Sequence, residues 1–192
     1  EGGGGGKVMI EDGLFEKTGI DEIYGMHNWP GMPLGQFGIR AGGIMAATDR
    51  FYIDIEGQGG HAARPQQTID PIIVAAQLVT ALQTIVSRNL DPLESAVLSV
   101  TMIEAGEADN VISRTAKITG TVRTLDSGVQ DFIEARLAEF VPQFAVSFGA
   151  KASIRYARGY PVTVNAAEQV AFAAEVAAEI VGSERVDPDT VP

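Results

Sequence analysis

Residues 48–58 alternate between apolar and polar side chains, and this pattern constrains the fold more than any other in the sequence. Phe51, Ile53 and Ile55 share one side of the extended chain, and polar or amphipathic residues take the other. A period of two predicts a β-strand that buries only one of its faces. Such a strand needs neighbouring strands and a layer of structure that covers its apolar side.

The next elements supply part of that layer. Asp70 is suited to cap a helix, and Pro71 suits its first turn, where a missing N–H costs nothing. Apolar residues then recur at helical spacing until residues 89–92 end the helix. A strand is predicted at residues 96–104, followed by a turn through residues 106–109.

A second strand, helix and strand follow. Residues 111–124 form a strand long enough to carry a bulge near Gly120. Asp126 offers the start of a helix with a broad apolar stripe, which Pro142 should kink or end early. Residues 151–158 read as the last strand.

In order, these elements are strand, helix, strand, strand, helix and strand, with one short turn between the central strands. This order predicts an α+β fold of the ferredoxin-like kind, a four-stranded antiparallel sheet with both helices on one face. The opposite face of the sheet is then left to solvent or to a partner.

The flanking segments differ in character. Residues 9–16 read as a short helix, and residues 20–26 as a short apolar strand that leads into His27. At the other end, Asn165 and the glutamate three positions later have the spacing of a capping box. Gly182 would end the helix that starts there.

We therefore expect a sheet domain, residues 47–162, inserted between two pieces of another domain, residues 1–46 and 163–192. The chain would cross between them at residues 42–43 and 159–161, and the two crossings should lie close together. Both ends of the sequence look like cuts through a longer protein.

Composition excludes several classes of function. The formal net charge is −11, which disfavours binding to nucleic acid. The absence of cysteine fits a reducing cytosol and predicts a cytoplasmic protein. We expect no membrane span, because the longest apolar run, residues 69–86, is interrupted by polar side chains.

The chain has two histidines, and each has two readings. His27 follows a predicted strand, where a histidine is often a structural hydrogen-bonding group; with a carboxylate from another strand end it would form half of a metal site. His61 could simply terminate a strand, but Gly59 and Gly60 would leave its ring uncovered, which suits a role facing a substrate.

Other polar residues are informative only together. Glu1 precedes five glycines, which read as a linker or a functional loop, but not as a phosphate-binding loop because Val8 follows Lys7. Asn110 suits a local turn, and Arg123 a solvated strand. An imidazole, a carboxamide and a guanidinium on one sheet would nevertheless suit an oxyanion and a carboxylate.

Five segments in this order resemble the M20 metallopeptidase and amidohydrolase family. The nearest branch resembles aminoacylase-type members that act on hippurate, N-acetyl amino acids and indole-acetyl amino acid conjugates. The matching segments are residues 1–7 (EGGGGGK), 25–31 (GMHNWPG), 59–65 (GGHAARP), 106–112 (GEADNVI) and 120–124 (GTVRT).

The resemblance implies a role for each of the polar residues above. Glu1 and His27 match metal ligands of the family. His61 matches the histidine that polarises the scissile carbonyl, often in the active site of the neighbouring subunit. Asn110 and Arg123 match residues that hold the carbonyl and the carboxylate of the substrate.

The resemblance also implies a two-domain enzyme. A zinc-peptidase-like α/β catalytic domain would hold two divalent metal ions, zinc, manganese, cobalt or nickel, and the sheet domain would serve as its lid and dimerisation domain. The substrate would be a small N-acyl amino acid and the protein a homodimer. Upstream metal ligands and the catalytic glutamate of the family are absent, so we expect no hydrolysis by these 192 residues alone.

Two other functions remain open from the sequence. The chain could serve only as a dimerisation module. Alternatively, the ferredoxin-like sheet could be a regulatory domain that binds a small ligand such as an amino acid without any metal.

Overall fold

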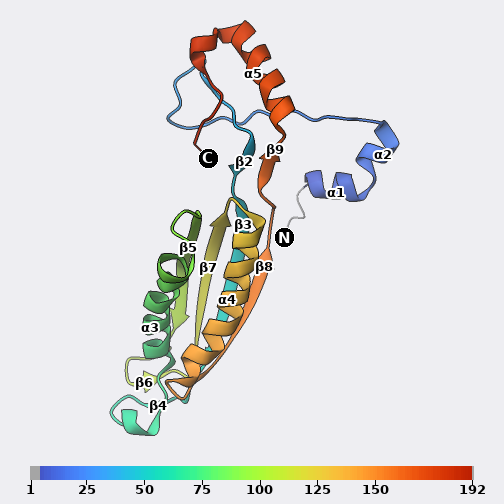
Figure 1. The fold of residues 1–192 in the computed structure, drawn as a ribbon. Helices are drawn as coiled ribbons and strands as arrows, with labels where there is room; N and C mark the ends of the chain where they lie inside the picture. The colour runs from blue at the N-terminus through green and yellow to red at the C-terminus, as the bar shows by residue number, and fades with distance from the viewer. Residues whose placement is uncertain (1–4, 192) are drawn as a thin grey trace. The chain divides into compact units, whose positions relative to one another are not determined.

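The computed structural model of the protein describes residues 5–191 (Figure 1). The chain divides into two compact units, Glu1–Leu34 and Gly35–Pro192. Each unit is described by itself below.

The first unit contains two short helices. Helix α1 spans Gly5–Glu11 and helix α2 spans Leu14–Thr18, with Gly13 between them in a left-handed conformation, φ 81°. The prediction of one helix over residues 9–16 was therefore wrong at its centre. The strand predicted at residues 20–26 is also absent, because an apolar segment becomes a strand only where another strand pairs with it. No described residue of this unit is buried.

The second unit is built on a four-stranded antiparallel sheet with the strand order β5-β7-β3-β8. Two helices, α3 and α4, lie on one face of this sheet (Figure 1). The predicted succession of elements and the antiparallel pairing are confirmed. The bounds are β3 Ala47–Glu56, α3 Pro71–Thr84, β5 Ala96–Ala105, β7 Thr115–Thr124, α4 Ser127–Val146 and β8 Lys151–Arg158.

The core lies between the sheet and the two helices. In β3 the buried side chains alternate as predicted, and those of β7 do the same. Together with the inner faces of the helices they form one apolar cluster. Its largest fully buried members are Phe51, Ile53, Ile55, Val74, Leu78, Leu82, Ile85, Ile118, Val122, Ile133, Leu137 and Val141.

Helix α3 begins as the sequence predicts. The Asp70 carboxylate accepts a hydrogen bond from the Ile72 amide at 2.9 Å, and Pro71 occupies the first turn. The helix continues into one π-helical turn, Ile85–Asn89. Despite the polar side chains that interrupt it, Pro71–Asn89 is long and apolar enough to cross a membrane by length and composition alone. Its apolar side covers the sheet instead.

Helix α4 also starts at its predicted cap. The Asp126 carboxylate accepts hydrogen bonds from the amides of Gly128 and Val129 at 2.7 and 3.1 Å. The helix does not end at Pro142 but runs on to Val146. Ala145, which lies beyond the proline, is fully buried, and this packing outweighs the hydrogen bond that proline cannot donate.

The predicted strand 111–124 is two strands. Strand β6 is Val111–Ile112, and β7 begins only at Thr115. The bulge expected near Gly120 lies on the neighbouring strand, where the pairing with β7 shifts between Val100 and Met102. At Gly120 itself there is no room for a side chain, because a Cβ there would lie 2.1 Å from the Phe51 ring.

Two small ribbons extend the sheet unit. At one end, β4 (Gly60–His61) pairs with β6 and leads to a 3₁₀ turn, η1 (Pro65–Gln67). Elsewhere in the unit, β2 (Gly42–Met45) pairs antiparallel with β9 (Thr163–Asn165), as expected for two neighbouring crossings. We call the first ribbon and its loops, residues 57–70 and 106–114, the arm.

The last segment returns through a helix. Helix α5 spans Ala167–Val181 and ends at Gly182, as predicted. The predicted capping box is absent, because Ala166 takes the N-cap position and the Asn165 amide donates to the Arg40 carbonyl at 3.1 Å instead. A 3₁₀ turn, η3 (Ser183–Arg185), then leads to β10 (Val186–Asp187), which pairs in parallel with β1 (Phe37–Gly38).

Candidate functional site

The arm brings His61 and Asn110 together. His61 faces Val111 across the β4–β6 ribbon, and the Ala62 amide donates to the Asn110 carbonyl at 3.0 Å. Both residues are exposed. A short ribbon thus brings the backbone of Asn110 next to that of His61, beyond the end of the four-stranded sheet.

The backbone around His61 fixes which ring nitrogen carries the proton. The Ala63 amide donates a hydrogen bond to His61 Nδ1 at 3.1 Å. Nδ1 is therefore an acceptor, and in the neutral ring the hydrogen must lie on Nε2. The exposed edge of His61 is thus a hydrogen-bond donor, which suits an oxygen that gains negative charge.

His27 in the first unit has the opposite arrangement. Its Nδ1 lies 2.5 Å from the carbonyl oxygen of Asn28, and because a carbonyl can only accept, Nδ1 carries the hydrogen. Nε2 then presents a lone pair to the outside. A histidine that donates one ring N–H to a backbone carbonyl and offers the other nitrogen has the usual arrangement of a metal ligand. The ring of Trp29 lies edge-on at 6.1 Å.

The described part of the chain does not hold a metal site by itself. Among residues 5–191, no group of three or more His, Asp or Glu side chains lies close enough to bind an ion. The other predicted ligand, Glu1, lies outside the described residues. His27 therefore fits one ligand position, and further ligands would have to come from elsewhere.

Arg123 lies at the other end of the sheet. It is half-buried near the end of β7, paired with Thr48 on β3 and Val97 on β5. Its guanidinium donates to the Val122 carbonyl at 2.9 Å and to the Thr121 hydroxyl, and it forms no ion pair with the described carboxylates. The arm joins β7 at Thr115, eight residues away, which is about 26 Å along a strand. The structure does not bring Arg123 to His61 within one chain.

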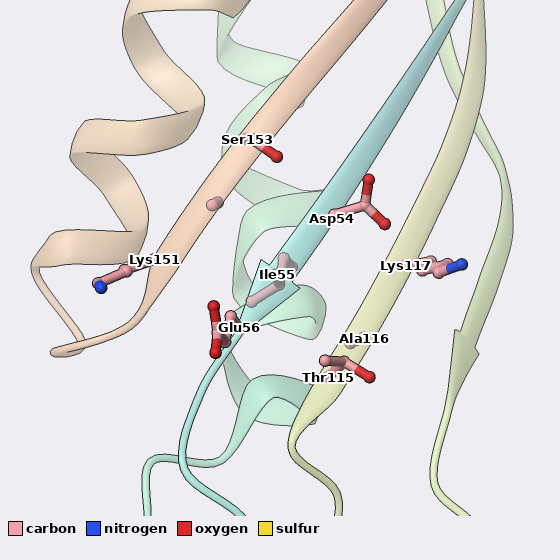
Figure 2. Close-up of a pocket in the computed structure, with 9 residues that line it drawn as sticks. Asp54, Ile55, Glu56, Thr115, Ala116, Lys117, Lys151 and Ser153 are labelled. Carbon is pink, nitrogen blue, oxygen red and sulfur yellow. The ribbon is translucent and has the colours of Figure 1, made fainter.

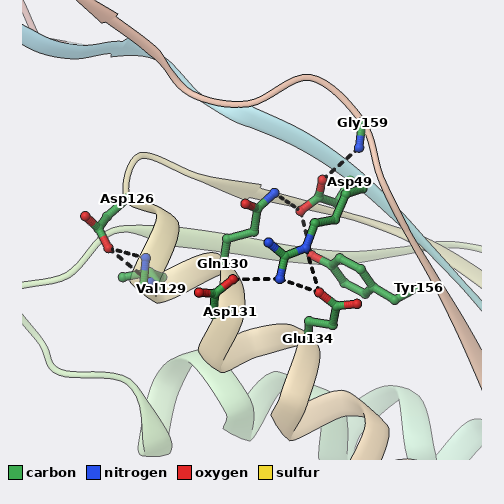
Figure 3. Close-up of polar contacts among 10 residues, drawn as sticks. Asp49, Asp126, Val129, Gln130, Asp131, Glu134, Tyr156 and Gly159 are labelled. Carbon is green, nitrogen blue, oxygen red and sulfur yellow. Dashed lines mark hydrogen bonds and ion pairs between the residues drawn. The ribbon is translucent and has the colours of Figure 1, made fainter. Parts of the chain in front are cut away.

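A buried polar cluster lies beside that end of the sheet (Figure 3). The Asp49 carboxylate is 1% exposed and accepts hydrogen bonds from the Gln130 amide at 2.7 Å, the Tyr156 hydroxyl at 2.7 Å and the Gly159 amide at 3.0 Å. It ties together β3, α4, β8 and the crossing that leads to β9. This cluster was not predicted, although a carboxylate on the apolar side of the 48–58 alternation is a visible signal in the sequence.

The pKa values of two groups in and beside this cluster are raised. Burial, and next the hydrogen bond to Asp49, raise the pKa of the Tyr156 hydroxyl, so that it remains a donor. Hydrogen bonds to Asp131 and Glu134 of α4 raise the pKa of the Arg158 guanidinium. Tyr156 and Arg158 therefore both keep their protons and remain hydrogen-bond donors at neutral pH.

A shallow hollow of about 360 Å³ lies on the sheet face turned away from the helices (Figure 2). Carboxylates and ammonium groups alternate around it, and it includes none of the predicted site residues. Beside it, the hydrogen bond and then the charge of Arg114 lower the pKa of Glu56. The lining residues are Asp54, Ile55, Glu56, Thr115, Ala116, Lys117, Lys151, Ala152 and Ser153.

Comparison with known proteins adds to this geometry. Residues 1–192 match the peptidase family M20/M25/M40. The chain is 46% identical over 165 residues to an N-acetyl-L-cysteine deacetylase of Bacillus subtilis, which covers 86% of this chain and 39% of the relative. It is 41% identical over 187 residues to a hippurate hydrolase of Campylobacter jejuni, and the match covers 97% of this chain and 49% of the relative. It is 40% identical over 171 residues to an N-acetyldiaminopimelate deacetylase of Halalkalibacterium halodurans, covering 89% and 46%.

Solved structures are similar over the same extent. A putative aminohydrolase from methicillin-resistant Staphylococcus aureus superposes with a TM-score of 0.85 at 29% identity, covering 98% of this chain and 49% of that one. A Bacillus subtilis protein described as a dinuclear metal-binding peptidase of the M20 family gives 0.74 at 31% identity, covering 96% and 45%. The chain thus spans about half the length, or less, of the proteins that it matches.

Proposed function

The chain belongs to peptidase family M20/M25/M40, and from this premise we propose that it forms part of a metal-dependent amidohydrolase that cleaves the amide bond of N-acyl amino acids. The names of the relatives support this reaction class, since they include deacetylases of N-acetyl amino acids and a hippurate hydrolase. The observation that carries the proposal is the opposite hydrogen bonding of the two histidine rings.

We assign the two histidines to different steps of one reaction. His27 and Glu1 would be ligands of a two-metal site that takes zinc, manganese, cobalt or nickel. A divalent metal ion bound there supplies Lewis acidity and an activated water. His61 would donate its Nε2 hydrogen to the oxygen of the scissile carbonyl, and the Asn110 carboxamide would donate to the same oxygen as negative charge develops on it.

Arg123 would bind the carboxylate of the amino acid. Its guanidinium is half-buried, oriented by the Val122 carbonyl, and free of a described carboxylate partner. Such a group can hold a carboxylate through two parallel N–H bonds. This contact would select N-acyl amino acids over amides without the carboxylate.

The distance between Arg123 and the arm supports a homodimer. One small substrate cannot contact both ends of a strand that is about 26 Å long, so His61 and Asn110 of one copy would act in the site of the other. Strand β5 is an edge strand of the sheet with Val97, Met102 and Ile103 exposed along it. We propose this edge as the dimer contact.

The domain assignment belongs to the same proposal. Residues 47–162 would form a ferredoxin-like lid and dimerisation domain, and residues 1–46 and 163–192 would belong to the α/β catalytic domain. We also keep the cytoplasmic location predicted from the cysteine-free sequence.

The reaction is tested on the full-length protein that contains this chain. We expect release of the free amino acid from hippurate or an N-acetyl amino acid, measured with ninhydrin, in the presence of zinc, manganese, cobalt or nickel. Chelation and His27→Ala should each abolish it, and the 192 residues alone should release none. Failure to hydrolyse any N-acyl amino acid with all four metals would reject the proposal.

Sharing of the site between copies is tested by mixing two inactive variants. His61→Ala and Arg123→Ala, unfolded together and refolded at equal amounts, should form mixed dimers that each contain one intact site. Random pairing then restores about a quarter of the wild-type activity, by the arithmetic of a two-fold dimer. No recovery, with dimers confirmed by light scattering, would contradict the sharing of one site between two copies.

A further inference from the structure

Three arginines lie close together on the open face of the sheet, the face turned away from α3 and α4. They are Arg50 on β3, Arg123 on β7 and Arg155 on β8. All three occupy positions of the alternation opposite to the buried ones. We call this part of the face the arginine half, to distinguish it from the part that contains the hollow of Figure 2.

The strand register places these arginines on one diagonal. Arg50 faces Thr121, two positions from Arg123, and on the other side Arg155 faces Tyr52, two positions from Arg50. Diagonal neighbours on adjacent strands lie roughly 7–8 Å apart, which is within reach of long side chains. Arg50 therefore lies between Arg123 and Arg155, one diagonal step from each.

Carboxylates are sparse on the arginine half. The open-face positions that face or flank Arg50 and Arg123 carry neutral side chains. These positions are Thr48, Tyr52, Val97, Ser99, Met102, Thr119, Thr121 and Ala157. Asp54, one diagonal step from Arg155, is the nearest acidic position along β3 and forms no ion pair with it in the described structure.

Three other arginines of the sheet unit differ from these in having carboxylate partners, in a chain with 25 Asp and Glu against 14 Lys and Arg. Arg114 pairs with Glu56, Arg136 with Glu139, and Arg158 with Asp131 and Glu134. Like charges on neighbouring strands repel each other, so an anion bound from outside the sheet would stabilise the arginine half.

The arginine half is also partly ordered before any ligand binds. The Arg155 guanidinium lies over the Tyr52 ring at 3.9 Å from its centroid. Stacking of this kind occupies the flat face of a guanidinium and leaves the N–H groups at its edge free for a carboxylate. Arg123 is oriented by its bonds to the Val122 carbonyl and the Thr121 hydroxyl.

We propose that Arg50 and Arg155 bind a second carboxylate of the substrate, so that the site selects N-acyl derivatives of dicarboxylic amino acids. The inference rests on the proposed function, in which Arg123 holds the first carboxylate. A small dianion fits better than a polyanion such as nucleic acid, because the surrounding net charge of −11 repels an extended one.

The test compares N-acetylglutamate with N-acetylglutamine on the full-length protein. The two compounds have nearly the same shape and differ in the side-chain charge. We expect kcat/KM to be at least about tenfold higher for N-acetylglutamate, the effect of one charge-assisted hydrogen bond. Arg50→Gln and Arg155→Gln should each reduce this ratio, and Arg88→Gln, at an exposed position of the π-helical turn after α3, should keep it.

The outcomes separate this inference from the proposed function. Equal kcat/KM for the two compounds, or a ratio unchanged in both arginine variants, would overturn the inference while the amidohydrolase assignment stands. If neither compound is hydrolysed, the amidohydrolase assignment is not supported, and calorimetric binding of the same two compounds decides the inference alone. Tighter binding of N-acetylglutamate that both variants weaken supports it, and equal binding rejects it.

Discussion

The two histidines of this protein lie in regions that are held in very different ways. His61 lies on the β4–β6 ribbon, at the end of a four-stranded sheet whose core side chains are fully buried. His27 lies in Glu1–Leu34, where no described residue is buried and where Ile23 and Met26 are 62% and 82% exposed. Large apolar side chains that remain exposed mark a surface that something else covers. The sheet can thus position its imidazole alone, and the first unit cannot.

The chemical roles follow the same division. A metal ligand can be ordered by the metal and by the other ligands when they bind. A group that must donate a hydrogen bond to a developing oxyanion has to be in place beforehand, because reorganisation during the reaction would cost rate. His61 has the rigid support that its proposed role needs, and His27, among the described residues, is held by its bond to the Asn28 carbonyl and by the edge-on ring of Trp29.

Hydrogen exchange should show the largest difference between the two regions. Amides of β3 and β7 are expected to exchange only through global unfolding, and those of residues 5–34 through local opening, at least about a thousandfold faster. Mass spectrometry of peptic fragments measures both in one sample. Protection in residues 20–26 as high as that in β3 would show that the first unit is as well supported as the sheet.

Core truncation should separate the regions by free energy. Leu137 is fully buried in α4 against the sheet, so Leu137→Ala removes packed methyl groups and leaves a cavity. We expect a loss of about 2–5 kcal/mol in the free energy of unfolding, measured by urea denaturation and circular dichroism. The matched change Ile23→Ala in the first unit should stay within about 0.5 kcal/mol. Equal effects of the two substitutions would contradict the comparison.

The buried polar cluster allows the same comparison with a carboxylate. Asp49→Ala leaves the donors of Gln130, Tyr156 and Gly159 without their acceptor, and we expect a loss of roughly 2–4 kcal/mol in the free energy of unfolding. Asp21→Ala, at an exposed position of the first unit, is the control and should have little effect. A neutral result for Asp49→Ala would mean that water replaces the carboxylate at no cost.

The difference between the regions also explains how much the sequence could predict. In β3 the alternation of apolar residues, and in α3 the cap at Asp70, are local signals that the tertiary structure reinforces, and both predictions are confirmed. The strand predicted at residues 20–26 had the same apolar character but no partner strand in its unit, and no local pattern reveals that absence.

Tertiary packing decided the other errors. Pro142 is a local signal to end a helix, and the burial of Ala145 beyond it overrides that signal. Asn165 has the spacing of a capping residue, but its amide bonds to Arg40, which is distant in sequence. The site residues on the sheet could be named from the sequence. The separation of His61 from Arg123 could not, because it depends on the length of β7, which lies between β6 and Arg123.

The smallest expected effect concerns the base of the arm. Glu56 ends β3 and accepts a hydrogen bond from Arg114 at 2.6 Å, and this contact lowers the pKa of the carboxyl group. Because the pKa is lower in the folded state, the contact stabilises the fold above the ordinary pKa of glutamate. That stability is lost as the pH falls through the lowered value. Arg114→Gln should therefore raise the pKa of Glu56 toward its ordinary value, as followed by carbon-13 NMR of the carboxyl group. Arg64→Gln, on the same arm, is the control and should leave the titration of Glu56 unchanged. A pKa shift of equal size in both variants would assign the effect to the general charge of the arm and not to a fixed contact between Arg114 and Glu56.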